Sequence, residues 1–407
     1  MLKIHNLTPD IFHQNNYYLL TNQKSTMISD YCQMGGIDFM FDEESYLCEV
    51  ELPLSWNDTL KNIDILEHID WSYLAKNPSK KIVLTHRIIY NLRDYKEKLN
   101  EISLKYNLSE RLYWFTFNPL DFKHKKQCKF KLLFLDSLTN VFYEAMTYKT
   151  YLCNQRSQEV NDLQKYSYGF EPKDSNFQKL DLDICDKYFI SSSVTIKAHR
   201  LLSTYLINKN IDSFKGIVSF HGLNDPYLNT NTYLSDHQMN LINHDIDLQE
   251  VLDFKSFKQV LDDEELFNPW FNNLRHSYLD LYERCLTNYV NESTSNQSEV
   301  FITEKTWINY AHGKPFILNA NKNMLTWLEK YYGFKSFPSL FDESYDSKDN
   351  FVDRVYYGVD ELVKFCSLSF EDAKNKVKSI QKTLDHNYKV FYSINHKERF
   401  KKIFDVI

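Results

Sequence analysis

Short strand-like runs alternate with helical patterns twice along this chain, and this alternation limits the possible folds more than any other feature. The helical patterns have apolar residues at helical spacing, and strands that alternate with helices of this length indicate a parallel sheet with crossover helices. In the first stretch we expect a helix at 90–106 and strands at 46–52, 81–85, 111–117 and 130–135.

A polar segment rich in Asn, Gln, Ser and Asp, from about 144 to 186, predicts a domain boundary before the second stretch. A long, irregular and partly helical insertion is expected from 221 to about 299, and a helical end from 349. The other strands are expected at 187–193, 216–220, 300–303, 315–318 and 335–337, and the helices at 196–206, 305–312 and 323–332.

The whole pattern predicts an α/β fold of two facing, doubly wound (Rossmann-like) domains with a C-terminal helical segment. We place the domains at 1–170 and 171–385 and the last helix at 386–407. In such folds a ligand is expected in the crevice at the carboxyl ends of the strands.

Composition narrows the function classes. Hydrophobic residues make up 43% and charged residues 25%, with 8 Gly and 9 Pro, which excludes disordered and collagen-like chains. The net charge of -7 argues against binding to DNA or membrane by overall charge, but it leaves room for a local basic patch. Seven widely spaced Cys with no CxxC pair favour reduced thiols in the cytoplasm over a zinc site or disulfides. Without a signal peptide or a long apolar run, we expect a soluble cytoplasmic protein with no membrane partner.

The segment 299–307 carries the clearest chemical pattern. Thr303 lies between an expected strand and a helix, where it can act as the N-cap. Glu304 and Lys305 then fall in the first turn, where free backbone N–H groups attract phosphate. The Lys adds positive charge, and the carboxylate can accept hydrogen bonds from ribose hydroxyls. The alternative is a capped helix whose Glu and Lys are only solvated.

The segment 187–200 is the second candidate. A strand runs into the Ser-rich turn 191–193 and then into a helix that carries His199 and Arg200. Ser hydroxyls and an Arg at a strand-to-helix junction suit a diphosphate, because Arg contacts phosphate with two parallel hydrogen bonds. The alternative is that Arg200 pairs with a carboxylate on the helix surface.

Together the two segments resemble the donor half of glycosyltransferases of the GT-B type, particularly the α-1,3-fucosyltransferase family. The resemblance spans about 185–345 and implies a GT-B fold whose first domain serves the acceptor and whose second binds a nucleotide sugar, with no metal or cofactor. It implies that Arg200 and Lys305 hold the donor diphosphate and Glu304 its ribose. The predicted donor-binding residues are Ser192, His199, Arg200, Thr303, Glu304 and Lys305.

A second resemblance is to a group of phage-encoded, glycosyltransferase-like proteins that share five ordered blocks with this chain. The blocks are His199-Arg200, 216–220, 303–317, 333–337 and 342–346. The chain departs from that group at 191–193, where Ser-Ser-Ser replaces the usual Leu-Asn-Arg, which leaves the donor identity open.

An inverting reaction needs a base that takes the proton of the acceptor hydroxyl. GT-B enzymes supply it from the N-terminal domain, and we predict His86, just after a strand, and Asp38 as catalytic residues. The alternative for His86 is a structural histidine. The further candidates are Asp42, Glu49 and Glu51.

A basic run at 123–131, with Phe122 and Phe130 among its lysines, predicts a polyanionic acceptor bound by Lys123, Lys125 and Lys126. The alternative is a solvated loop. With the phage resemblance, the acceptor hypothesis is a modified base in double-stranded DNA, which an enzyme must reach by flipping or by groove entry. The other hypotheses are a glycan or protein acceptor, and a non-catalytic nucleotide- or glycan-binding module.

A cluster of carboxylates, Asp342, Glu343 and Asp346, follows the expected strand 335–337. These side chains could bind a cation or sugar hydroxyls at the crevice, or form a solvated acidic loop. The aromatic residues around them are expected in the core. They are Trp307, Phe316, Trp327 and Phe334.

Overall fold

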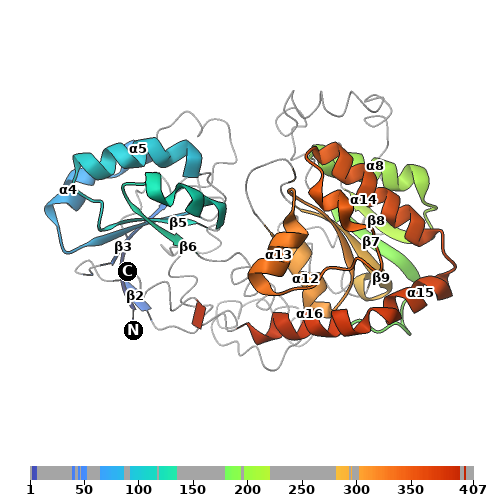
Figure 1. The fold of residues 1–407 in the computed structure, drawn as a ribbon. Helices are drawn as coiled ribbons and strands as arrows, with labels where there is room; N and C mark the ends of the chain where they lie inside the picture. Colours follow the sequence, from blue (N-terminus) through green and yellow to red (C-terminus); the bar gives the residue numbers. More distant parts are fainter. Residues whose placement is uncertain are drawn as a thin grey trace, which may run out of the picture. The chain divides into compact units, whose positions relative to one another are not determined.

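The computed structural model (Figure 1) forms two compact units, each with a parallel sheet. The first unit holds the described elements from β1 to β6, and the second holds those from β7 to α16. The structure describes residues 2–6, 39–41, 45, 47–52, 65–86, 92–116, 119–134, 179–193, 197–220, 281–292, 295, 302–394 and 398–399.

The sheet of the first unit has the order β2-β1-β3-β4-β5-β6, and every neighbouring pair is parallel. Its strands are β1 (Leu2–Asn6), β2 (Phe39–Phe41), β3 (Leu47–Leu52), β4 (Lys81–His86), β5 (Leu112–Thr116) and β6 (Lys131–Phe134). Its helices are η1 (Ile65–His68), α4 (Trp71–Lys76), α5 (Leu92–Lys105) and η2 (Pro119–Gln127).

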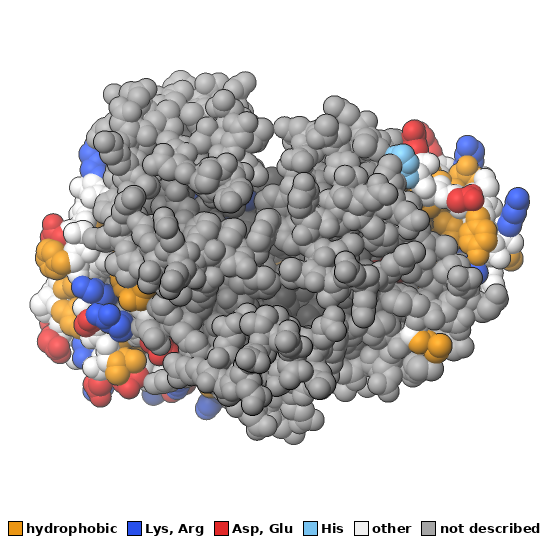
Figure 2. Space-filling model, turned by 180° about the vertical axis from the view of Figure 1, so that it is seen from behind, with side chains coloured by type: hydrophobic (Ala, Val, Ile, Leu, Met, Phe, Trp, Pro, Cys, Tyr) orange, Lys and Arg blue, Asp and Glu red, His pale blue; other side chains and the backbone are white. Residues whose placement is uncertain are grey.

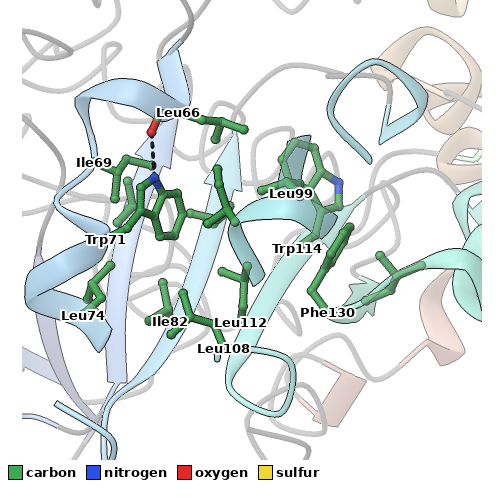
Figure 3. Close-up of a cluster of buried hydrophobic side chains, with 14 of the residues drawn as sticks. Leu66, Ile69, Trp71, Leu74, Ile82, Leu99, Leu108, Leu112, Trp114 and Phe130 are labelled. Carbon is green, nitrogen blue, oxygen red and sulfur yellow. Dashed lines mark hydrogen bonds between the residues drawn. The ribbon is translucent and has the colours of Figure 1, made fainter. Parts of the chain in front are cut away.

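The core of the first unit lies between the sheet and its helices (Figure 3). Helix α5 buries Leu92 and Leu99, which are seven residues apart and therefore lie on one face. The buried indole of Trp71 donates a hydrogen bond from Nε1 to the carbonyl oxygen of Leu66 (2.8 Å), which satisfies its polar end. Arg111 donates to four carbonyls at the end of α4 and the following turn and so closes that helix.

The second unit has the strand order β10-β9-β7-β8, again with parallel pairs. Its strands are β7 (Lys187–Ser193), β8 (Gly216–Phe220), β9 (Cys285–Asn291) and β10 (Phe316–Asn319). Its helices are α8 (Ala198–Asn210), α12 (Glu304–His312), α13 (Met324–Tyr332), η9 (Glu343–Ser347), α14 (Phe351–Cys366), α15 (Phe370–Ser379) and α16 (Gln381–Ser393).

The helices of this unit cover both faces of its sheet (Figure 1). Helices α8 and α14 pack against each other, and α12 packs against α16. The crossovers β7–α8–β8 and β9–α12–β10 run in opposite directions across the sheet. Because such crossovers are right-handed, α8 and α12 lie on opposite faces.

Several expected elements agree with the structure. Strands β7 and β8 have the expected bounds, and α12, α13 and β10 begin within a residue of the predicted start. Both sheets are parallel, as the alternation of strands and helices predicts. Trp307, Phe316 and Phe334 are buried, as expected of core residues, whereas Trp327 is only partly buried. The domain boundaries and the facing GT-B arrangement stay predictions.

One expected strand is wrong, and the described half of another, 300–303, is not a strand either. Residues 335–337 form no strand, and Ile302 and Thr303 lie outside any strand. The strand that precedes α12 is β9, inside the segment that we expected to be irregular and helical. All seven residues of β9 are buried although several are polar, so its sequence does not show the apolar run typical of a buried strand.

The surface of the described part carries charges of both signs. Figure 2 shows Lys and Arg side chains next to Asp and Glu side chains on one face of the molecule. Within the described residues, no helix is both long enough and apolar enough to cross a membrane.

Candidate functional site

The order of the strands in the second sheet reverses between β7 and β9. The chain passes from β7 to β8 on one side, then returns to place β9 on the other side of β7, with β10 beyond it. At such a switch point, the two neighbouring crossover helices lie on opposite faces, and their N-termini flank a crevice at the carboxyl ends of the strands. Here those helices are α8 and α12, the two that carry the predicted donor residues.

Glu292, the first residue after β9, connects the first turns of these two helices. Its carbonyl oxygen accepts hydrogen bonds from His199 Nε2 (2.8 Å) and from Arg200 Nε and Nη2 (3.3 and 3.1 Å). Its carboxylate oxygen Oε1 accepts from the backbone N–H of Thr303 (3.0 Å) and from Thr306 Oγ1 (2.5 Å). Its other oxygen, Oε2, accepts from Thr303 Oγ1 (2.7 Å). The carboxylate is fully buried.

Thr303 is the N-cap of α12, as the sequence predicts. Its backbone is extended, and its hydroxyl accepts from the backbone N–H of Lys305 (3.4 Å). The Nζ atom of Lys305 lies 3.5 Å from the same hydroxyl oxygen. Glu304 is the first residue of α12, but its side chain lies outside the described residues. The predicted Thr303 and Lys305 therefore meet at the start of this helix.

The predicted residues of the segment 187–200 lie at the end of β7 and the start of α8. Ser192 is partly buried on β7, whereas His199 and Arg200 are buried in the first turn of α8. Arg200 reaches the carbonyl oxygen of Glu292, at the end of the neighbouring strand β9. The structure thus brings His199, Arg200, Thr303 and Lys305 together around Glu292.

Lys197, just before α8, adds a further positive charge. Its pKa is lowered to about 7, first by burial and then by the charges of Arg200 and Lys305, with Glu292 acting in the opposite direction. Three cations therefore lie within electrostatic reach of one carboxylate. Such a site attracts anions, and it does so most strongly where water is excluded.

His199 is neutral in this site. Burial and the positive charge of Arg200 place its pKa well below the ordinary value of 6.5. Because its Nε2 faces a carbonyl oxygen, that nitrogen carries the proton and donates it. His199 is therefore a fixed hydrogen-bond donor to Glu292.

Buried polar side chains lie at the carboxyl ends of three neighbouring strands. Asn319 of β10 pairs with Asn291 of β9. Because Ile190 of β7 pairs with Asn288 of β9, the same register places Ser193 of β7 beside Asn291 on its other side. Asn319 Nδ2 donates to Asn291 Oδ1 (2.7 Å). Ser193 Oγ, Asn291 Nδ2 and Asn319 Oδ1 are buried with no hydrogen-bond partner among the described residues. Buried polar atoms of this kind are normally satisfied by water or a ligand, so this edge can bind polar groups.

The predicted catalytic residues belong to the other unit. Asp38 and Asp42 lie outside the described residues. His86 is the last residue of β4, but its side chain is not among those that the structure describes. Glu49 is fully buried on β3, where its Oε1 accepts a hydrogen bond from Thr85 Oγ1 (2.7 Å). The roles of His86 and Asp38 stay predictions.

The basic run lies on and after η2. Lys125 and Lys126 are exposed, whereas the side chain of Lys123 lies outside the described residues. Phe130 is buried in the core of the first unit, and Lys131 pairs with Glu110 (3.1 Å). The expected alternation of lysines with accessible aromatic rings is therefore wrong at Phe130, which cannot stack on a base.

The acidic cluster has structural partners. Asp342 accepts from the N–H of Ser344 and caps η9, and Glu343 accepts from the N–H of Phe337. Asp346 accepts from the N–H groups of Met324 and Leu325 at the start of α13 (2.9 and 3.1 Å). These three carboxylates accept hydrogen bonds from backbone N–H groups, and this structural role explains their presence without a bound cation or sugar. The described part of the chain contains no group of His, Cys, Asp and Glu arranged to hold a metal ion.

Two residues of the site were not among the sequence predictions. Lys197 lies inside the predicted segment 187–200, and its position just before the helix was the available signal. Glu292 could have been predicted only if β9 had been predicted first. Its place directly after that strand puts it at the edge of the sheet where the carboxyl ends of the strands lie.

No protein-family model matches the chain, and no curated protein sequence matches it. Among solved structures, one match is the crystal structure of an alpha1,3-fucosyltransferase, with 14% sequence identity to this chain. The superposition covers 100% of this chain and 88% of that chain, with a TM-score of 0.36.

Proposed function

We propose that the chain is a glycosyltransferase that moves a sugar from a nucleotide-sugar donor to an acceptor hydroxyl. The observation that carries the proposal is the meeting of Arg200, Lys197 and Lys305 with the N-termini of α8 and α12 at the switch point. Helix N-termini and basic side chains are the groups that proteins use to bind diphosphates. The sequence resemblance of both segments to the donor half of GT-B glycosyltransferases favours a nucleotide sugar.

The proposed reaction breaks the bond between the anomeric carbon of the sugar and the diphosphate oxygen. Negative charge then develops on the leaving diphosphate, and Arg200, Lys305 and the positive end of the α12 dipole stabilise it. The acceptor hydroxyl attacks the anomeric carbon and loses its proton to a base, for which His86 and Asp38 stay the candidates. Glu304 is the proposed ribose ligand and Ser192 a further donor contact. The proposed reaction uses no metal or cofactor.

The acceptor is proposed to bind the first unit. The exposed Lys125 and Lys126 favour a polyanion such as double-stranded DNA with a modified base. Transfer to hydroxymethylated DNA, lost when both lysines are changed to Ala, is the result expected for that acceptor. Transfer to an oligosaccharide or a protein, and none to DNA, would replace it with the alternative acceptor. A cytoplasmic location stays a prediction.

A thermal-shift screen with UDP, GDP, CMP and their common sugar conjugates tests the donor site. A ligand at about 100 times its Kd adds about 2.7 kcal/mol to the unfolding free energy, enough to raise Tm by several degrees. Lys305→Ala is the sharper variant, because Arg200→Ala would also remove two hydrogen bonds from the Glu292 carbonyl. Lys330→Ala, an exposed lysine on α13, is the matched control.

The expected result is a shift with one nucleotide family that Lys305→Ala loses and Lys330→Ala keeps. Release of nucleoside diphosphate from the matching sugar conjugate would then establish transfer or hydrolysis. Selective binding without either reaction, with every donor and acceptor tried, would favour the non-catalytic binding module. No shift with any nucleotide would contradict the proposed donor site.

A further inference from the structure

We propose that Glu292 is a positioning residue of the anion site: it holds the first turns of α8 and α12 in the arrangement that directs Arg200 and Lys305 toward one bound anion. The inference rests on the proposed function. Glu292 lies outside both predicted segments, and its proposed role is to position other residues and not to contact the donor itself.

Every polar group of Glu292 is used, and each one reaches a different part of the site. The backbone N–H donates to the carbonyl oxygen of Asn319, at the end of β10 (3.0 Å). The carbonyl oxygen holds His199 and Arg200 of α8, and the carboxylate holds Thr303 and Thr306 of α12. Since α8 and α12 lie on opposite faces of the sheet, this single residue links the first turns of two helices that lie far apart in the sequence.

The link to Lys305 passes through one hydroxyl group. Thr303 Oγ1 donates its proton to Glu292 Oε2 (2.7 Å) and accepts from the backbone N–H of Lys305 (3.4 Å). The carboxylate therefore fixes the direction of that hydroxyl, and its lone pairs then face Lys305, whose Nζ lies 3.5 Å away. Arg200, in contrast, binds the carbonyl oxygen, which any substitution at this position retains. A change in the carboxylate should act mainly through Lys305.

Charge and position predict opposite results for the loss of this carboxylate. As a negative charge near Lys197, Arg200 and Lys305, it repels a bound anion, so its removal alone would tighten anion binding. As the group that orders α12, it is required for the correct direction of Lys305, so its removal would weaken binding. The sign of the change in Kd therefore separates the two roles.

The test is the Kd of pyrophosphate, measured by isothermal titration calorimetry on the full chain. We expect Glu292→Ala to weaken binding by about tenfold or more, which is about 1.4 kcal/mol. Glu292→Gln should lose less, because its amide oxygen can still accept from the Thr303 N–H and from Thr306. Glu361→Gln is the control: it alters another buried glutamate of the same unit, which accepts from the N–H of Asp342 (2.7 Å), and it should leave the Kd unchanged.

A double-mutant cycle shows whether the effect passes through Lys305. In the Lys305→Ala background, Glu292→Ala should weaken pyrophosphate binding much less than it does in the wild type, because the two changes remove one shared effect. Equal effects in both backgrounds would overturn the proposed route through Lys305.

Tighter or unchanged pyrophosphate binding in a folded Glu292→Ala variant would overturn the inference. If that variant does not fold, as judged by its circular dichroism and Tm, the Thr306→Val variant tests the inference in its place. This change removes one hydrogen bond to Oε1 (2.5 Å) at nearly constant shape, and it should weaken binding severalfold; an unchanged Kd would overturn the inference. Failure of the wild type to bind pyrophosphate, UDP or GDP would overturn the proposed donor site, and the inference with it.

Discussion

Lys197 should make anion binding depend on pH in a range where most lysines stay charged. Its pKa is lowered to about 7, first by desolvation and then by the positive charges of Arg200 and Lys305, while the charge of Glu292 acts in the opposite direction. Below pH 7 the ammonium group is already present when the anion arrives. Above pH 7 the site must first take up a proton, and each pH unit then reduces the binding contribution of Lys197 by up to about 1.4 kcal/mol.

The assay compares the pyrophosphate Kd of the wild type with that of Lys197→Met at pH 6, 7, 8 and 9. The comparison cancels the titration of pyrophosphate itself, which is common to both proteins. A hydrogen bond to a charged group contributes about 1.5–3 kcal/mol, so Lys197→Met should bind roughly ten to a hundred times more weakly at pH 6. The ratio of the two Kd values should fall toward one at pH 9.

Lys330→Met, on an exposed lysine of α13, should bind like the wild type at every pH. A ratio between wild type and Lys197→Met that does not change with pH would refute the reasoning, because it would mean that Lys197 stays charged in the free site. A ratio of one throughout would mean that Lys197 does not face the anion.

Three further predictions concern the second unit. Burial lowers the pKa of Lys314 to about 8, so between about pH 8 and its ordinary 10.5 the unfolded chain binds a proton that the folded protein lacks. The unfolding free energy should rise with pH in that window by about 3 kcal/mol relative to Lys314→Met, and parallel profiles in urea titrations would contradict this. Asp346→Ala removes two hydrogen bonds from the start of α13 and should lower stability by about 1–3 kcal/mol in urea unfolding, whereas an unchanged midpoint would show that the cap is dispensable. Gly216→Ala would place a Cβ 2.1 Å from Phe189 Cε1, and it should lower stability by about 1–3 kcal/mol; a stable variant with an unmoved ring in its crystal structure would contradict the packing.

The parts of the fold that follow from local patterns were predictable. Strands β7 and β8 combine short apolar runs with clear ends, and the cap at Thr303 follows from the chemistry of one residue and its neighbours. Strand β9 was not predictable in this way, because it buries polar side chains. Thr287 donates to the carbonyl of Pro315 (2.9 Å) and Asn288 to Asn309 (3.0 Å), so these residues are satisfied inside the fold.

The candidate site was predictable only in part for the same reason. Thr303 and Lys305 lie two residues apart and share one helix turn, so the sequence brings them together. The role of Glu292 depends on bonds to residues 11 and 14 positions later and more than 90 positions earlier. No local pattern reports such contacts. The same holds for Asp346, whose partners at the start of α13 lie over 20 residues away.

Hydrogen–deuterium exchange with and without saturating pyrophosphate, UDP or GDP tests most directly where an anion binds. We expect slower exchange in the first turns of α8 and α12, at residues 197–200 and 303–306, because an anion held by Arg200 and Lys305 would stabilise both turns against opening. Protection confined to other parts of the chain, with these two turns unchanged at saturation, would contradict a donor site at the switch point of the second sheet.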